Sequence, residues 1–303
     1  MMRIIVGLLF AAASFSSCGG GMAVRREAEK TAVDRRYDSV FWDTWGDGFA
    51  EVSVYGFETP RDGELRDGES ILIFSSEKLG KIPVIKLNWL RNFQTGISDF
   101  SEMNTSFLSL VNGRMAKTSF SRQNWDGHLF AQAVFDPSGI RVMDGDAALQ
   151  TLENQENWMS EDGLIFWARG MAGPFLKPGE TVTLPFLTGL RSAKDARQPM
   201  AWSRVQLTRG AEAEKVETSA GEFVVELYSA DLPSGKGFRF MIEKDAPYRM
   251  VRWQTTAGEV GELYASERVK YWEMNLPGGE EALRQLGLEP RTPRLIPDEP
   301  QNE

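Results

Sequence analysis

The stretch Ser106-Phe-Leu-Ser-Leu-Val-Asn-Gly-Arg-Met-Ala-Lys-Thr-Ser-Phe120 decides the fold class of this chain. Two strand-like runs lie on either side of Asn112-Gly113. An Asn-Gly pair accepts the positive φ angle that a type I′ turn requires, and it is a strong short-range signal for a β-hairpin. The stretch therefore predicts two antiparallel strands joined by a tight turn.

Similar runs, rich in β-branched and aromatic residues, recur along the chain and are each closed by a turn signal. They are 50–55, 70–74, 83–88, 128–135, 181–184, 202–207, 222–228, 237–242, 249–254 and 262–272. Such spacing indicates antiparallel sheet rather than alternating strands and helices. Two segments lack turn signals and predict helices, namely 147–158 (AALQTLENQENW) and 163–171 (GLIFWARGM).

The composition and net charge of the chain argue against several classes of function. The 303 residues carry a formal net charge of −9, with one cysteine and one histidine. Nucleic-acid binding asks for a basic surface, so we predict no nucleic-acid partner. A lone cysteine excludes a disulfide within the chain, and so few sulfur and imidazole ligands argue against a zinc site. The chain has no glycine-rich phosphate-binding motif, so we predict no cofactor and no metal.

The first 17 residues have the features of a secretion signal: Arg3 is followed by the apolar run 4–13 and by small residues before Cys18. This resembles a bacterial lipoprotein signal, in which the cysteine becomes the first residue of the mature chain and is acylated. The resemblance implies lipidation of Cys18 and anchorage to a membrane through N-terminal acyl groups. It places the protein in the cell envelope, at the outer membrane facing the periplasm. An ordinary cleaved signal and an uncleaved anchor remain alternatives.

Several stretches carry a resemblance to known families: 162–169 (DGLIFWAR), 177–185 (KPGETVTLP), 217–223 (ETSAGEF) and the strand that ends at Tyr271-Trp272. Residues 160–272 resemble a widespread family of exported bacterial domains of unknown function, and are similar to the half-barrels that carry lipoproteins. With Ala50-Glu51 and residues 86–96, the whole chain resembles uncharacterised lipoproteins sometimes mislabelled septum formation inhibitor. The resemblance implies a curved antiparallel sheet with a helix against its concave side.

We therefore predict a mainly β fold, with antiparallel curved sheets or a half-barrel and one or two helices packed in the middle. The sequence leaves open whether its two β regions form one sheet. The expected organisation is a signal at 1–17, a charged tether at 18–40, an N-terminal β region at 41–146, a helix plus half-barrel at 147–278, and a helix turn with a disordered Pro-rich tail at 279–303.

In a half-barrel, aromatic residues of the middle helix and of neighbouring strands would line an apolar cleft. The predicted ligand-binding residues are Phe166, Trp167, Phe240 and Trp253, with Arg239 and Arg252 at the rim to pair with a phosphate or carboxylate. The alternative is that the same aromatic residues fill the core and leave no cavity.

His128 is the sole histidine, and it is predicted either to contact a ligand or to be structural. No motif presents a serine for it to activate, so we predict no catalytic residue.

These features favour a non-enzymatic envelope lipoprotein that binds a lipid or a lipidated partner in an apolar cleft. A carboxylate-based hydrolase or binder of envelope glycans is the first alternative, and it requires two acids in an open aromatic groove, one with a raised pKa. A structural protein that contacts partner lipoproteins through its sheet edges is the second. It predicts a large exposed apolar patch and no pocket.

Overall fold

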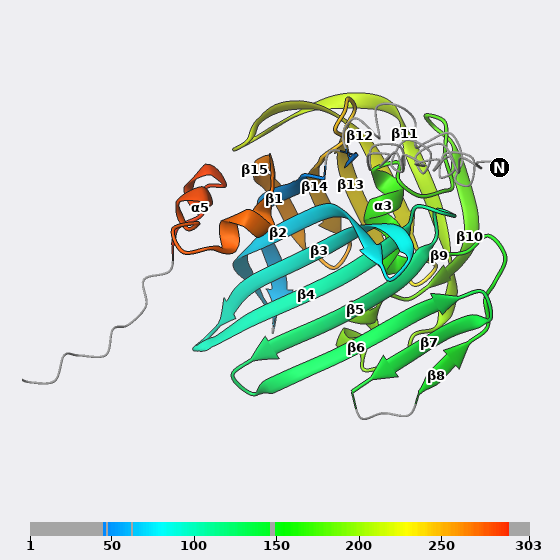
Figure 1. The fold of residues 1–303 in the computed structure, drawn as a ribbon. Coiled ribbons are helices and arrows are strands. Elements are labelled where there is room, and N and C mark those ends of the chain that lie inside the picture. The colour runs from blue at the N-terminus through cyan, green and yellow to red at the C-terminus, as the bar shows by residue number, and fades with distance from the viewer. Residues whose placement is uncertain (1–44, 47, 62, 146–148, 291–303) are drawn as a thin grey trace, which may run out of the picture.

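The computed structural model describes residues 45–46, 48–61, 63–145 and 149–290 (Figure 1). The expected signal and the whole of the expected tether, including Cys18, lie outside the described residues, as does the expected tail beyond residue 290. In the described part, no helix is both long enough and apolar enough to cross a membrane.

The described residues form a mainly β fold, which confirms the predicted fold class. The first eight strands are β1 (Ala50–Arg61), β2 (Glu64–Leu79), β3 (Ile82–Thr95), β4 (Ser98–Ser109), β5 (Met115–Asn124), β6 (Gly127–Asp136), β7 (Gly139–Asp144) and β8 (Gln150–Leu152). The others are β9 (Met159–Ser160), β10 (Thr181–Leu187), β11 (Trp202–Thr218), β12 (Gly221–Asp231), β13 (Gly237–Glu243), β14 (Met250–Thr255) and β15 (Val260–Val269). The short helices are η1 (Glu161–Gly163), α3 (Leu164–Ala168), α4 (Leu190–Ala196), η2 (Tyr271–Asn275) and α5 (Glu281–Gln285).

All of these strands belong to one sheet, in the order β8-β7-β6-β5-β4-β3-β2-β1-β15-β14-β13-β12-β11-β10-β9. β1 pairs with β15 as well as with β2, so the two β regions of the sequence form one continuous sheet. Neighbouring strands are antiparallel, except for the parallel pair β9 and β10. The sheet curves round so that α3 lies inside it, and its two end strands, β8 and β9, do not pair with each other (Figure 1).

The predicted hairpin is present as β4 and β5, but its turn is not of type I′. Gly113 has a φ angle of 66°, whereas Asn112 is not among the residues with a positive φ angle. Instead, Asn112 Oδ1 accepts a hydrogen bond from the backbone N–H of Arg114 at 3.0 Å. A side-chain turn of this kind needs no left-handed residue at Asn112, and the connection extends over residues 110–114.

One of the two predicted helices is present and the other is wrong. η1 and α3 form the expected middle helix, although α3 ends at Ala168. In the other segment, Gln150–Leu152 forms β8 and pairs with β7. A helix of so few residues is marginal by itself, so pairing with an available strand edge outweighs a weak helical period.

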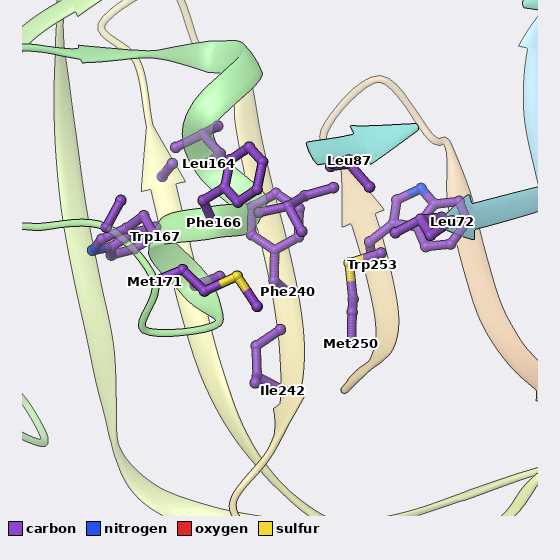
Figure 2. Packing of buried hydrophobic residues seen from close by; sticks show 14 of the residues in the cluster. Leu72, Leu87, Leu164, Phe166, Trp167, Met171, Phe240, Ile242, Met250 and Trp253 are labelled. Atoms are coloured by element: carbon purple, nitrogen blue, oxygen red, sulfur yellow. The ribbon is translucent and has the colours of Figure 1, made fainter. Parts of the chain in front are cut away.

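The core surrounds α3, all of whose residues are buried. A helix that is apolar on every side requires apolar neighbours on every side. Figure 2 shows Phe166 and Trp167 of α3 among buried residues of β13, including Phe240 and Ile242. The same core cluster includes residues of β1 to β4, so the interior of the curved sheet is packed rather than hollow around α3.

A buried ion pair fixes the end of α3. Arg169, the C-cap residue, donates through Nη1 and Nη2 to the Glu51 carboxylate of β1 at 2.7 and 2.9 Å. Its Nε donates to the Tyr248 carbonyl oxygen at 2.8 Å, and Nη2 also donates to that of Pro247 at 3.0 Å. The guanidinium therefore joins α3 to β1 and to the β13–β14 connection.

Candidate functional site

The residues predicted to line an apolar cleft are packed core instead. Phe166, Trp167, Phe240 and Trp253 are 0%, 2%, 3% and 1% exposed. The Trp167 indole N–H donates to the Pro174 carbonyl oxygen at 2.9 Å, which holds that ring in place. A cavity of about 60 Å³ touches Phe240 and Trp253, enough for a few waters. These four aromatic residues therefore fill the core, as the alternative in the sequence analysis states.

Both arginines that were predicted at the rim of the cleft are paired with acids of neighbouring strands. Arg239 Nη2 lies 2.7 Å from Asp231 Oδ1, and Arg252 is hydrogen-bonded to Glu262. Alternation along β13 and β14 explains their position: Phe240 and Trp253 point into the core, so the adjacent arginines point to the other face. The structure therefore does not place them at the mouth of an apolar site.

His128 is exposed at the start of β6, where it stands opposite Gln123 of β5. β6 is not adjacent in the sheet to β13 or β14, which carry Phe240 and Trp253. The structure does not bring the histidine together with the other predicted residues.

A groove of about 830 Å³ lies between the β4–β5 hairpin and β10. We call it the seam groove, because it follows the part of the molecule where the sheet does not close. Four separate chain segments form it. Its lining residues are Leu108, Asn112–Met115, Glu156–Ser160, Gly163, Ala172–Phe175 and Val182–Pro185.

The exposed lining of the seam groove is about half apolar and half polar. Leu108 and Met115 come from the hairpin, and Leu184 from β10, and all three are buried. Phe175 lines the groove with a ring that is 43% exposed. The lining charges are those of Arg114 and Glu156, which have opposite signs. The groove is therefore neutral overall and suits an uncharged occupant.

β10 also presents an open edge to this groove. β9 pairs with β10 at Phe186 and Leu187, and no other described strand pairs with residues 181–185 on that side. Pro185 has no backbone N–H, and such a residue is tolerated at a sheet edge. The seam is open at this point because β9 has only two residues and covers only the end of β10.

A second apolar groove, of about 630 Å³, lies on the outer face of the sheet. Val52 and Val54 of β1 pack there against Leu286 and Leu288, which follow α5. The C-terminal segment thus covers part of this face, and the remaining groove is lined in part by Leu276 and Leu283. We call it the α5 groove.

An ion cluster holds α4 at one end of the curved sheet. Arg191 of α4 donates to Glu102 at 3.0 Å and to Glu259 at 2.8 Å. Burial alone would raise the pKa of Glu259, but Arg191 and Arg91 lower it to about 2. Asp195 of α4 pairs with Arg122 in the same cluster. α4 is therefore attached to the sheet by these ion pairs and by the packing of its buried Leu190 and Ala193.

Asp162 joins η1 to α4. Its Oδ1 accepts a hydrogen bond from Asn104 Nδ2 at 2.8 Å, and its Oδ2 accepts one from the backbone N–H of Leu190 at 3.2 Å. Burial raises the pKa of Asp162 to about 6, although both hydrogen bonds act in the opposite direction. Among the described residues, no other carboxyl group has a resolved upward shift. Asp162 lines the cavity of about 60 Å³ that also touches Phe240 and Trp253.

The raised pKa of Asp162 predicts a specific pH dependence of stability. The native state binds this proton more tightly than the unfolded state, so the free energy of unfolding falls as the pH rises from about 4 to above 6. The expected loss is about 2–3 kcal/mol. Urea unfolding across pH 4–7 gives the free energy of unfolding of the parent and of Asp162→Asn. The difference between these two free energies should change with pH by the expected amount. Parallel curves would contradict the assignment.

Sequence reasoning missed the residues of the seam groove. Ala172–Phe175 and Val182–Pro185 stand close to prolines that signal turns and edges, and these prolines could have indicated an open sheet edge. Nothing in a single sequence shows that they meet the β4–β5 hairpin. Among the described residues, no three His, Cys, Asp or Glu side chains lie close enough together to hold a metal ion.

Comparisons with known proteins concern the fold. No family model matches the chain, and no curated protein matches it. The chain is similar to a β-barrel-like protein of the domain of unknown function DUF1849 from Brucella abortus, with 10% sequence identity and a TM-score of 0.49, over 73% of this chain and 98% of that chain. It is also similar to a DUF1089 family protein from Pseudomonas aeruginosa, with 11% identity and a TM-score of 0.35, over 60% of this chain and 86% of that one.

Proposed function

We propose that this protein is a non-enzymatic binding protein of the cell envelope, anchored through acylated Cys18, that holds the apolar chain of a lipid or lipidated partner in the seam groove. The observation that carries the proposal is the open seam itself: a groove of about 830 Å³, lined in part by Leu108, Met115 and Leu184, beside a stretch of β10 that pairs with no described strand on that side. Small-molecule sites typically have about 300–1,000 Å³.

The groove has room for an alkyl chain. It is built from four segments and runs from the β4–β5 hairpin to the edge of β10. Its two lining charges, on Arg114 and Glu156, have opposite signs, so an alkyl chain in the groove covers no net charge. Burial of such a chain contributes about 0.8 kcal/mol for each CH₂ group removed from water.

The expected result of native mass spectrometry is one bound lipid for each chain. The protein carries Cys18→Ser in every sample, so that no acyl group is attached at that residue. Phe175→Asp is expected to reduce the bound fraction about tenfold or more, because the lost ring contact with the chain is worth about 1.5–3 kcal/mol. Solvent extraction and mass analysis identify the released lipid.

Phe130→Asp is the matched control. Phe130 is 40% exposed on β6, close to the 43% of Phe175, but it does not line the seam groove. This variant should keep the lipid. An empty parent protein, or equal losses in the two variants, would refute the proposed site.

The glycan-hydrolase alternative lacks its structural requirement. It needs two acids in an open aromatic groove, one of them with a raised pKa. Asp162 is the described carboxyl group with such a pKa, and the cavity that it lines has a volume of about 60 Å³. Small-molecule sites typically have about 300–1,000 Å³, so this cavity is too small for a glycan. We therefore retain the binding function as the single proposal.

A further inference from the structure

A second pocket shares a wall with the seam groove. It has a volume of about 330 Å³. Gly170 and Met171, which follow α3, line this pocket, whereas the next residues, Ala172–Phe175, line the seam groove. The short segment 170–175 therefore contributes to both sites, first to the pocket and then to the seam groove.

We call this second site the aromatic–cationic pocket, after its lining by Trp45, Arg169, Arg209, Tyr228, Lys244 and Tyr248. The β13–β14 connection forms one wall, where Tyr248 has a φ angle of 59°. A tyrosine adopts this left-handed conformation at a cost of about 1–2 kcal/mol. The backbone N–H of Tyr248 donates to the Asp245 carbonyl oxygen at 2.9 Å, which closes the turn and sets the ring at the pocket. Backbone strain of this kind is concentrated at ligand sites.

All but one of the charged side chains in this pocket have an opposite partner. Arg169 pairs with Glu51, and Arg209 pairs with Glu226 at 2.7 Å. Glu243 also lines the pocket, and its Oε2 lies 2.9 Å from Nε of Arg249.

Lys244 is the exception, because it lines the pocket and forms no ion pair with any described residue. Asp245 follows it in sequence but is not part of the lining. The pocket consequently has an excess of one positive charge. A lysine ammonium group is a compact point charge that suits a phosphate or a carboxylate.

We infer that the aromatic–cationic pocket receives the anionic head, a phosphate or a carboxylate, of the same amphiphile whose apolar chain lies in the seam groove. This inference rests on the proposed function and specifies the class of its ligand. Lys244 neutralises the head, and the aromatic walls partly exclude water, which strengthens the attraction relative to an open surface.

The experiment compares two ligands with the same alkyl chain, dodecyl phosphate and dodecan-1-ol, and adds inorganic phosphate as a third. Dissociation constants are measured by native mass spectrometry on the Cys18→Ser chain. Dodecyl phosphate is expected to bind about tenfold more tightly than dodecan-1-ol, as one charge-assisted contact would give. Lys244→Met should bring this ratio to about one and leave dodecan-1-ol binding unchanged.

Lys81→Met is the matched control, since it removes the same charge from an exposed lysine at the turn between β2 and β3, and it should keep the tenfold ratio. A ratio near one in the parent, or a ratio that survives Lys244→Met, overturns the inference. So does inorganic phosphate that binds as tightly as dodecyl phosphate, because the site would then be one for free phosphate. If dodecan-1-ol does not bind the parent, or if its binding survives Phe175→Asp, the proposed function itself fails.

Discussion

Arg169→Met is expected to lower the free energy of unfolding by about 3–5 kcal/mol, because it leaves the Glu51 carboxylate buried without its partner. The two side chains are 1% and 2% exposed, so water cannot replace the lost hydrogen bonds. The backbone oxygens of Pro247 and Tyr248 lose donors in the same step. Urea unfolding at pH 7, followed by circular dichroism, measures the loss.

A double variant separates the unpaired charge from the lost packing. Glu51→Gln combined with Arg169→Met removes both charges, so its loss of stability should be smaller than that of Arg169→Met alone. If the single variant loses less than about 1 kcal/mol, the ion pair does not anchor α3 in the way described.

Trp253→Ala is expected to destabilise the fold by about 3–5 kcal/mol, as large-to-small changes of buried aromatic residues do. The indole is 1% exposed and lies 5.0 Å from the Tyr55 ring and 5.4 Å from the Trp89 ring, measured between centroids. Its Nε1–H donates to Glu259 at 3.3 Å, so the substitution also removes a hydrogen bond from the ion cluster that holds α4. Thermal and urea unfolding measure the change.

Two further variants test whether this packing is specific. A Cβ atom at Gly261 would lie 2.0 Å from the Trp253 ring, so Gly261→Ala should also destabilise the protein. Trp125→Ala changes an indole that is 66% exposed, and it should change stability by less than about 0.5 kcal/mol. Equal effects of Trp253→Ala and Trp125→Ala would show that the core around β14 is not packed as described.

The fold was largely predictable because it depends on local patterns. Strand-like runs separated by turn residues predict an antiparallel sheet, and the apolar segment that became α3 shows no polar face. The turn at Asn112 was not predictable in detail, because its side chain bonds the backbone of Arg114. The helix predicted from 147–158 failed because pairing between β7 and β8 is a tertiary interaction that no local period reports.

The site was much less predictable, because it depends on contacts between distant segments. The sequence pattern around Phe240 and Trp253 is compatible with either a cleft or a packed core. Their burial in the structure shows that they belong to the core. The seam groove unites residues near 110, 158, 174 and 184, which are unrelated in the sequence. The ion cluster likewise joins Glu102, Arg191 and Glu259 through the curvature of the sheet.

Acylation of Cys18 would set an upper limit to the distance between the membrane and the seam groove. The chain from Cys18 to Trp45 can span at most about 100 Å. A binding domain on such a tether can contact its own membrane and a ligand some distance from it. This is the physical reason that the proposed anchor and the proposed lipid site are compatible.

The most direct measurement is a crystal structure of the Cys18→Ser chain with dodecyl phosphate that carries a terminal bromine. The proposed function predicts an anomalous bromine peak in the seam groove, beside Phe175 and Leu184, and the further inference predicts the phosphate near Lys244. A bromine peak in the α5 groove, beside Leu276 and Leu283, would contradict the central claim. So would a crystal grown in saturating ligand that shows no peak.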